Sequence, residues 1–477
     1  MLADKRERIP DHHALYHLNK SILEDYVSKR LLRHFAFTCM VLCGVSAGDT
    51  VLASRVEISQ PELKGLDTGE PSGVITLGQA LSLAIMKNPG LAAYSWEVRA
   101  AEARILQASL LPNPEFSFEA EELGWSDARN GIGSAVMYFI FSQMLELGDK
   151  RGKRTSVAEL ETDIEDWEYA SKRLDLFAET TKAFIRALAA RKRLASSEKF
   201  HQLAKRVFQV VSERVEAGKV SPLEKTKAQV TLAGTRIELE RARRQWDVFR
   251  KRLAATWGST SPEFEGVKGD LERISDLPSL DKLLKQTAQN PDQARWETEI
   301  LLREAKLEFE KSKRIPNVTV SAGLQRFEQT NDNAFVFGLS IPLPIFNRNQ
   351  GGIEEARHNI RKVEQEKKVA NVRIKTELSG IYQVLSASYL EAMMLKKDVL
   401  PAAQRVFDGL SEGYRQGKFR YLDVLDAQRT LFDAQAKYIE ALANYHEASV
   451  EVERLIGQKA GEAGAAKGKR EEIVEKK

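Results

Sequence analysis

Two very long segments of the chain carry the hydrophobic spacing of an amphipathic helix. From about residue 153 to residue 216 there is no proline or glycine, and apolar or small residues recur at alternating steps of three and four. The second segment, over about residues 351–416, repeats this pattern from Ile353 toward Leu410 and is interrupted by Gly380 and Pro401. The heptad seam of the first segment consists of Val157, Leu160, Ile164, Trp167, Ser171, Leu174, Ala178, Thr181, Ile185 and Leu188. At 1.5 Å per residue, about 60 residues predict a rod of about 90 Å, much longer than an ordinary globular helix.

Each predicted rod ends in a glycine-containing turn and is followed by a second helical segment. Gly218 precedes Pro222, a residue that suits the first turn of a helix, and this second helix is expected to return to about residue 257. Gly417 is a natural helix C-cap before a helix expected over residues 421–456. The pattern therefore predicts two antiparallel helical hairpins with tips at residues 217–222 and 417–421.

Four shorter segments alternate apolar and polar residues with a period of two. They span about residues 115–123, 134–145, 317–327 and 334–343, close to the length of a tilted strand that crosses a membrane. A half-buried sheet packed on helices would show the same alternation, but the attached rods and the leader described below favour a membrane sheet. Four strands cannot close alone, so several copies must contribute to one barrel. The residues expected to face lipid are Phe335, Phe337, Leu339, Val318 and Val320.

The whole plan occurs twice along the chain. Asn88-Pro89 recurs as Asn290-Pro291, and Trp257-Gly258 recurs as Ile456-Gly457, at offsets of about 200 residues. We therefore expect two structural repeats, residues 75–258 and 279–457. The expected connecting segments are an N-terminal linker over residues 54–74, a Gly-, Ser- and Pro-rich linker over 259–278, and a disordered Lys/Glu/Gly/Ala tail over 458–477.

The N-terminal 53 residues are interpreted as an extension that ends in a secretory signal peptide. Phe35 to Ala47 is a short apolar stretch that follows Lys29, Arg30 and Arg33 and precedes small-residue cleavage patterns. The alternative is a buried helix that happens to follow basic residues. Acidic residues before position 28 do not fit a leader, which suggests a true start near Val27. Past Ala53 the sequence has no run of eighteen apolar residues.

Composition and motifs name no catalytic chemistry. The 72 lysines and arginines against 68 acids leave a charge of +4, which does not indicate a nucleic-acid partner. Both cysteines, Cys39 and Cys43, lie in the leader, so the mature chain is expected to lack thiol chemistry, zinc ribbons and disulfides. His201, His358 and His446 are isolated on predicted helices, and no metalloprotease, phosphate-loop or hydrolase motif is present. We expect no enzyme activity, no cofactor and no resident metal site.

The residues resemble a known family, the TolC-like outer-membrane factors of tripartite efflux pumps. The resemblance covers Ile75 to Gly457, and the motifs Arg314–Val320 and Ser340–Gly351 resemble the heavy-metal (cobalt, zinc, cadmium) CzcC-like branch. It implies a mainly α homotrimer in which each chain gives four strands to a twelve-stranded β-barrel and its long helices to a periplasmic α-barrel. It also implies a passive outer-membrane channel that docks on a periplasmic adapter (membrane fusion) protein and serves an inner-membrane RND-type pump.

Other functions fit parts of the same sequence. A drug-efflux channel and the outer channel of a type I secretion system would share the fold and the membrane and would differ in cargo. A periplasmic coiled-coil scaffold belongs to another class, but it would have no use for the exposed apolar face of Phe335, Phe337 and Leu339. The strands therefore favour the channel.

The resemblance also assigns roles at the hairpin tips. Asp423 and Asp426 match acidic residues that line the constricted pore entrance, where clustered carboxylates would attract cations. Hydrated acids near a helix N-terminus are the alternative. Tyr414 matches a gating tyrosine, and Glu224 occupies in the first half the position of Asp423. Phe419 stands where the family has a basic gate partner, with Arg420 next to it. The residues expected to dock the adapter are Gly218, Lys219, Ser221, Gly417 and Lys418.

Overall fold

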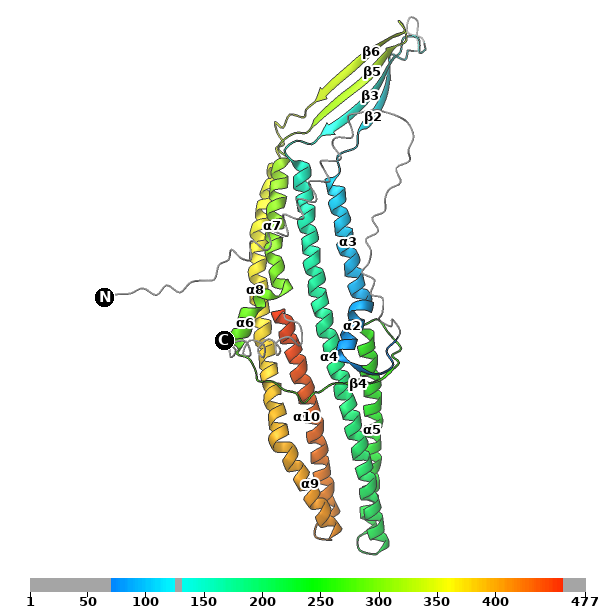
Figure 1. Cartoon of the computed structure of the whole chain (residues 1–477), viewed down its shortest axis with the longest axis vertical. Helices are drawn as coiled ribbons and strands as arrows, with labels where there is room; N and C mark the ends of the chain where they lie inside the picture. Colours follow the sequence, from blue (N-terminus) through cyan, green and yellow to red (C-terminus); the bar gives the residue numbers. More distant parts are fainter. Residues whose placement is uncertain (1–69, 125–130, 458–477) are drawn as a thin grey trace, which may run out of the picture. The chain divides into compact units, whose positions relative to one another are not determined.

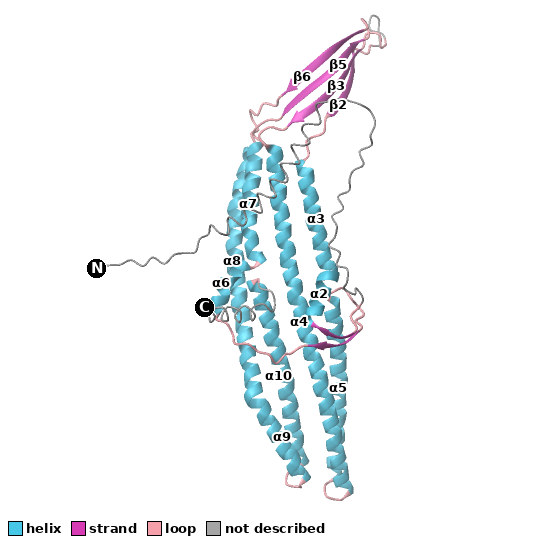
Figure 2. Cartoon of the chain, in the orientation of Figure 1, coloured by secondary structure: helices cyan, strands magenta, loops and turns pink. Residues whose placement is uncertain are grey.

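The computed structural model describes residues 70–124 and 131–457 (Figures 1 and 2). The expected signal peptide, most of the expected N-terminal linker and the expected tail lie outside these residues. No helix in the described ranges is both long enough and apolar enough to span a bilayer. The elements of the first half are β1 (Gly73–Thr76), α2 (Leu77–Lys87), α3 (Pro89–Ser109), β2 (Glu115–Glu121), β3 (Val136–Leu145), α4 (Lys150–Glu216), α5 (Pro222–Ala255) and β4 (Phe264–Lys268). Those of the second half are α6 (Leu280–Gln286), η2 (Thr287–Gln289), α7 (Pro291–Ser312), β5 (Val318–Phe327), β6 (Asp332–Ser340), α8 (Gln350–Met394), η3 (Leu395–Val399), α9 (Leu400–Arg415) and α10 (Tyr421–Ile456).

Helix α4 is a single rod of 67 residues that starts three residues before the predicted position. Its buried side includes Ala178, Thr181, Ile185 and Leu188, the C-terminal members of the predicted seam. α4 packs against α5 toward the tip, against α3 and α7 in its N-terminal half, and against α10. A continuous apolar stripe on a proline-free segment explains its length, since neither local sequence nor packing interrupts it.

The second rod is not continuous, in contrast to the single helix expected over residues 351–416. The π-helical turn η3 separates α8 from α9, and the Leu400 N–H bonds the Leu395 carbonyl, five residues back. Pro401 lies in the first turn of α9, where it offers no N–H and its ring would clash with the carbonyl four residues earlier in a regular helix. The extra residue in the π turn relieves that clash, and such turns are a recognised cause of helix bending.

The four longer strands form one antiparallel sheet in the order β2-β3-β5-β6. Direct cross-strand partners such as Ala322 and Phe337, or Phe118 and Phe139, share a face of the sheet. One face is therefore apolar and consists mainly of Phe116, Phe118, Phe139, Phe141, Val320, Leu324, Phe335, Phe337 and Leu339. These side chains are largely exposed, with Phe337 at 79%. The other face carries small or polar residues such as Ser321 and Gly338.

The Asn-Pro dipeptides of the sequence repeat have equivalent structural roles. The Asn88 Oδ1 accepts from the Leu91 N–H at 2.7 Å, and its Nδ2 donates to the Thr256 carbonyl at 2.9 Å. The Asn290 Oδ1 accepts from the Asp292 N–H at 2.7 Å, and its Nδ2 donates to the Arg454 carbonyl at 2.8 Å. Each asparagine thus caps one helix and ties it to the end of the returning helix of its own half.

The segments expected to be linkers contain a second, small sheet. β4 lies inside the predicted linker 259–278 and pairs in parallel with β1, which begins in the predicted linker 54–74. The linker is then fastened to α10: the Tyr445 hydroxyl donates to the Ser275 carbonyl at 3.0 Å, and the His446 Nε2 donates to the Leu271 carbonyl at 2.8 Å. The sequence did not predict these two strands, because each is only four or five residues long and is stabilised by a partner far away in sequence.

An ion-pair network joins the two halves through α4 and α10. The Arg186 guanidinium donates to Glu447 at 2.5 Å and to Glu440 at 2.7 Å, and Lys182 pairs with Glu451. Nearer the end of α10, Arg454 pairs with Asp175 at 3.0 Å. Cations on α4 therefore face mainly acids on α10, which favours one alignment of the two rods.

Candidate functional site: the hairpin tips

Both hairpins turn through the same backbone motif. At the first tip, Gly218 has φ +70°, and the Lys219 N–H bonds the Arg214 carbonyl at 2.9 Å. At the second tip, Gly417 has φ +79°, and the Lys418 N–H bonds the Gly413 carbonyl at 2.8 Å. These are Schellman turns, in which glycine accepts the left-handed conformation that other residues resist.

The helices that leave the tips begin with different caps. At the first tip the Ser221 Oγ accepts from the Leu223 N–H at 3.3 Å, and Pro222 occupies the first turn of α5. At the second tip the Asp423 Oδ2 accepts from the Arg420 N–H at 3.1 Å, and its Oδ1 lies 3.6 Å from the Arg420 guanidinium. Asp423 therefore has a local structural role at the start of α10.

Asp423 and Asp426 lie one turn apart on α10 and border the same hollow. This groove of about 660 Å³ lies between α9 and α10, close to the second tip. Its polar side consists of Asp423, Asp426 and Thr430, and its apolar wall consists of Val399, Ala402, Ala403, Val406, Leu410, Phe419 and Ala427. Asp423 is half-buried and Asp426 is exposed, so both carboxylates remain accessible to water and cations.

Tyr414 is the centre of a contact between the two tips. Its side chain is buried, with 4% exposed, and its hydroxyl donates to the Glu224 Oε2 at 3.2 Å. The Arg214 guanidinium lies 4.6 Å from the tyrosine ring centre and donates to the Tyr414 carbonyl. Burial, together with the Glu224 carboxylate, raises the pKa of Tyr414 to about 12. We call Arg214, Glu224 and Tyr414 the tip clasp.

The structure brings only some of the predicted gate residues together. Tyr414 and Glu224, both predicted, are in contact, whereas Phe419 packs over Gly413 and Arg420 is exposed beside Asp423. Arg214 was missed from the sequence. A basic side chain in the last turn before the tip glycine was the available signal, because such residues can reach helix carbonyls.

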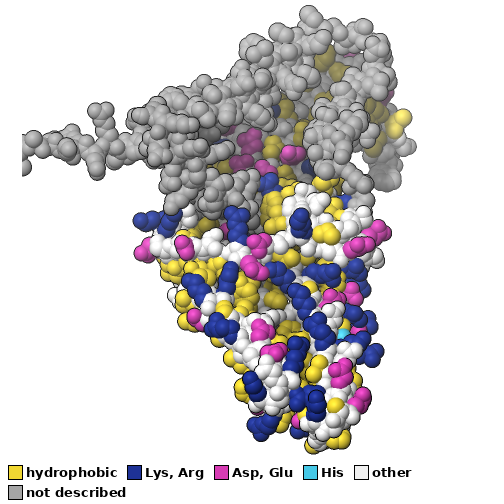
Figure 3. All heavy atoms as spheres, turned by 60° about the horizontal axis from the view of Figure 1, so that its bottom comes forward, with side chains coloured by type: hydrophobic (Ala, Val, Ile, Leu, Met, Phe, Trp, Pro, Cys, Tyr) yellow, Lys and Arg dark blue, Asp and Glu magenta, His cyan; other side chains and the backbone are white. Residues whose placement is uncertain are grey.

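The end of the molecule that carries the tips is rich in basic side chains. Figure 3 shows Lys and Arg side chains over this end, with Asp and Glu between them. Lys219, Lys418 and Arg420 are exposed at the two turns. The acids of the groove thus lie beside a surface that is well supplied with positive charge.

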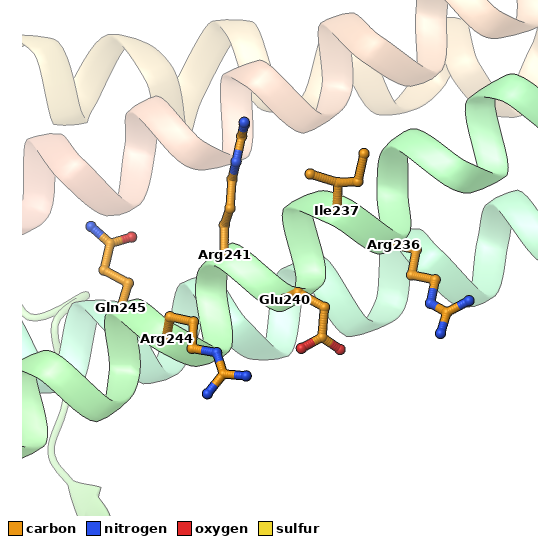
Figure 4. A pocket seen from close by; sticks show the side chains of 6 residues that line it. All are labelled: Arg236, Ile237, Glu240, Arg241, Arg244 and Gln245. Atoms are coloured by element: carbon orange, nitrogen blue, oxygen red, sulfur yellow. The ribbon is translucent and has the colours of Figure 1, made fainter.

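A depression on α5 does not bring its polar side chains together (Figure 4). A shallow depression of about 590 Å³ on α5 is formed by one helix face, whose side chains diverge (Figure 4). It is lined by Arg236, Ile237, Glu240, Arg241, Arg244 and Gln245. Within residues 70–124 and 131–457, no group of three His, Cys, Asp or Glu side chains is arranged to hold a metal ion.

Comparisons with known proteins agree with this architecture. The outer membrane efflux protein family matches residues 80–259 and 284–458. The cobalt-zinc-cadmium resistance protein CzcC of Cupriavidus metallidurans is 35% identical over 389 residues, which cover 82% of this chain and 91% of that protein. The nickel-cobalt-cadmium resistance protein NccC of Alcaligenes xylosoxydans xylosoxydans is 29% identical over 286 residues, 60% of this chain and 64% of that protein. The crystal structure of CusC has a TM-score of 0.69 at 14% identity and covers 81% of this chain and 94% of CusC, so the two share a fold.

Proposed function

The chain belongs to the outer membrane efflux protein family, and from this membership we propose that it is the passive outer-membrane channel of a tripartite system that exports heavy-metal cations. The observation that carries the choice of cargo is the similarity to CzcC along most of both chains. The channel performs no catalytic step. It provides a path, and an energy-coupled inner-membrane pump of the RND type provides the driving force.

The exposed apolar face of the sheet supports insertion in lipid. No described residue covers the side chains of Phe335, Phe337 and Leu339. They form an apolar surface, and the residues between them along β6 face the opposite side of the sheet. β2 and β6 are free edges of the described sheet, and open edges are not stable in hydrocarbon. Three copies that pair these edges would close a barrel of twelve strands, with the helices on the periplasmic side.

The tips are the proposed entrance. Asp423 and Asp426 of the copies would line a ring of carboxylates, which draws cations into a narrow passage. The tip clasp holds the second hairpin against the first and would keep the entrance narrow. The adapter would dock on the two turns, around Gly218, Lys219, Ser221, Gly417 and Lys418, whose backbone and side chains are exposed there.

Complementation and single-channel recording test this proposal. Expression of the chain, with its adapter and pump, in a strain that lacks its own exporter is expected to restore growth on cobalt, zinc or cadmium. Resistance to drugs or secretion of a protein without metal resistance would identify the alternative cargoes, and recovery as a soluble monomer would favour the scaffold.

The double variant D423A/D426A is expected to show weaker cation preference in single-channel recordings. The control D408A/E412A, which removes two exposed acids of α9 at the same tip, is expected to keep the parent's preference. Unchanged selectivity in D423A/D426A would mean that these acids do not line the entrance.

A further inference from the structure

The apolar period of β6 continues beyond the end of the strand. Ser340 is the last residue that pairs with β5, yet Ile341, Leu343 and Ile345 extend the alternation begun by Phe335. All three are exposed, Leu343 at 75%, and Phe346 next to them is 90% exposed. We call residues 341–346 the rim loop. It is an exposed apolar stretch, and it lies where the sheet gives way to the helices (Figure 1).

Polar side chains that follow the rim loop bond part of its backbone. Pro342 and Pro344 have no N–H, and the Ile345 N–H bonds the Leu343 carbonyl at 2.9 Å. The Arg348 Nε donates to the Pro344 carbonyl at 3.1 Å, and the Gln350 side chain donates to the Phe346 carbonyl at 3.2 Å. Each backbone group that has a protein partner, or that proline removes, lowers the cost of moving the loop into an apolar environment.

Two exposed arginines lie at the junction of sheet and helices to which the rim loop belongs. Arg151 lies in the first turn of α4 and Arg314 just after α7, and the guanidinium of neither makes a hydrogen bond or ion pair with the described residues. The segments that carry them are adjacent, because the Lys150 ammonium donates to the Ile315 carbonyl at 2.5 Å and the Asn349 Nδ2 donates to the Glu310 carbonyl at 2.9 Å. The N-termini of the long helices α4 and α8 add positive potential at the same level.

We propose that the rim loop inserts into the phospholipid leaflet on the helical side of the membrane, and that Arg151 and Arg314 hold anionic lipid headgroups there. The inference rests on the proposed function, since the sheet must span the bilayer for its rim to meet this leaflet. It is argued from the continuity of the apolar face and from the charge beside it. Apolar side chains flanked by unpaired cations match the boundary between acyl chains and anionic headgroups.

Single-cysteine labelling tests the insertion. With Cys39 and Cys43 replaced by serine, F346C places a polarity-sensitive fluorophore on the rim loop, F337C on the sheet face, and L223C on the exposed start of α5. In vesicles of phosphatidylethanolamine and phosphatidylglycerol, the first two labels are expected to emit at shorter wavelength and to be quenched by lipid-borne quenchers, and L223C is not. Quenching at F337C without quenching at F346C would overturn the inference alone and would point to a second copy or water around the loop. No quenching at either position would overturn the proposed function as well.

The headgroup part has its own measurement. The association constant of phosphatidylglycerol relative to phosphatidylethanolamine, from competition between quencher-bearing and plain lipids at F346C, is expected to fall about fivefold in R151Q and in R314Q, because one cation near an anionic surface is worth about 1 kcal/mol. The matched control is K418Q at the distant tip. An unchanged lipid preference in both arginine variants would overturn headgroup binding while leaving insertion intact.

Discussion

At the scale of single residues, the tip clasp shows how buried polar groups connect two distant parts of the chain. Tyr414 is held by a carboxylate and a guanidinium that belong to the other hairpin. A pKa raised from 10 to about 12 means that the folded state holds the phenolic proton more tightly than the unfolded state. This contribution to stability is complete below pH 10 and is lost as pH rises through about 12, so the clasp is intact at neutral pH.

Removing the Tyr414 hydroxyl should loosen the tips. Y414F loses the bond to Glu224 and leaves that carboxylate without its donor, a change worth about 1.5–3 kcal/mol for a hydrogen bond to a charged group. We expect a larger open probability in single-channel recordings. Y169F is the control, since the Tyr169 hydroxyl makes no hydrogen bond with the described residues. If the open probability of Y414F equalled that of the parent, the tip clasp would not control gating.

Glu453 is a second titratable residue whose pKa is shifted by burial. Burial on α10 raises its pKa from 4.5 to about 7, and its side chain makes no hydrogen bond or ion pair with the described residues. The contribution of Glu453 to stability is therefore fully present below pH 4.5 and is lost as pH rises through about 7.

E453Q should remove this pH dependence. We expect the variant to gain on the order of 2 kcal/mol at pH 8, allowing for partial exposure of the carboxylate, and to match the parent at pH 4.5. Thermal unfolding at the two pH values measures the difference. If E453Q lost the same amount of stability at pH 4.5 and at pH 8, Glu453 would instead make a hydrogen bond or ion pair in the assembled protein.

At the scale of elements, glycine and proline decide where the rods turn and bend. Gly218 and Gly417 adopt left-handed conformations that end helices α4 and α9. Pro401 follows directly after the π turn η3 and Leu400. Gly409 lies within the helix α9, where its φ is not positive and a β-carbon would meet open space. Two glycines eight residues apart therefore have opposite requirements.

Alanine should separate these two glycines. G417A is expected to destabilise the tip by about 1–2 kcal/mol, the cost of a β-carbon in the left-handed region, and to impair docking of the adapter with the channel still assembled. G409A is expected to stabilise its helix by about 0.5–1 kcal/mol. Thermal unfolding and pull-down with the adapter measure the two effects. Normal export by G417A would show that the adapter binds the protein elsewhere than at this turn.

At the scale of the whole molecule, the two ends of the hairpins meet different surroundings. The sheet presents aromatic side chains on one face, whereas the tips present charge. This division matches a protein that is anchored at one end and docks at the other, and the ion pairs of α4 and α10 lie between the two.

Reversing the polarity of the sheet face should block insertion. F337R places a cation on the proposed lipid face and is expected to cost about 2–4 kcal/mol near mid-bilayer. A334R is the control, because the alternation of β6 places Ala334 on the opposite face. Outer-membrane fractionation of the two variants measures the difference. Equal insertion of both would show that the aromatic face does not contact lipid.

The sequence by itself determined the long helical hairpins, their tips and the four longer strands, in their order along the chain. Long heptad seams, two tip glycines and four alternating segments lie within continuous stretches, and periodicity is a property of neighbouring residues. The resemblance to TolC-like outer-membrane factors of the heavy-metal branch, based on the same segments, is confirmed by the family match and by the similarity to CzcC.

Only the tertiary structure decided which distant residues meet. Tyr414 contacts Glu224 and Arg214, which are 190 and 200 residues away in the sequence. β1 pairs with β4 across a similar separation in sequence. A hydrophobic pattern also does not show the side-chain bonds to the Pro344 and Phe346 carbonyls or the π turn before Pro401. Hydrogen bonds act over about 3 Å in space, whereas a periodic pattern records only which side of one element is apolar. Contacts between elements therefore depend on how the rods align, which no single segment of the chain encodes.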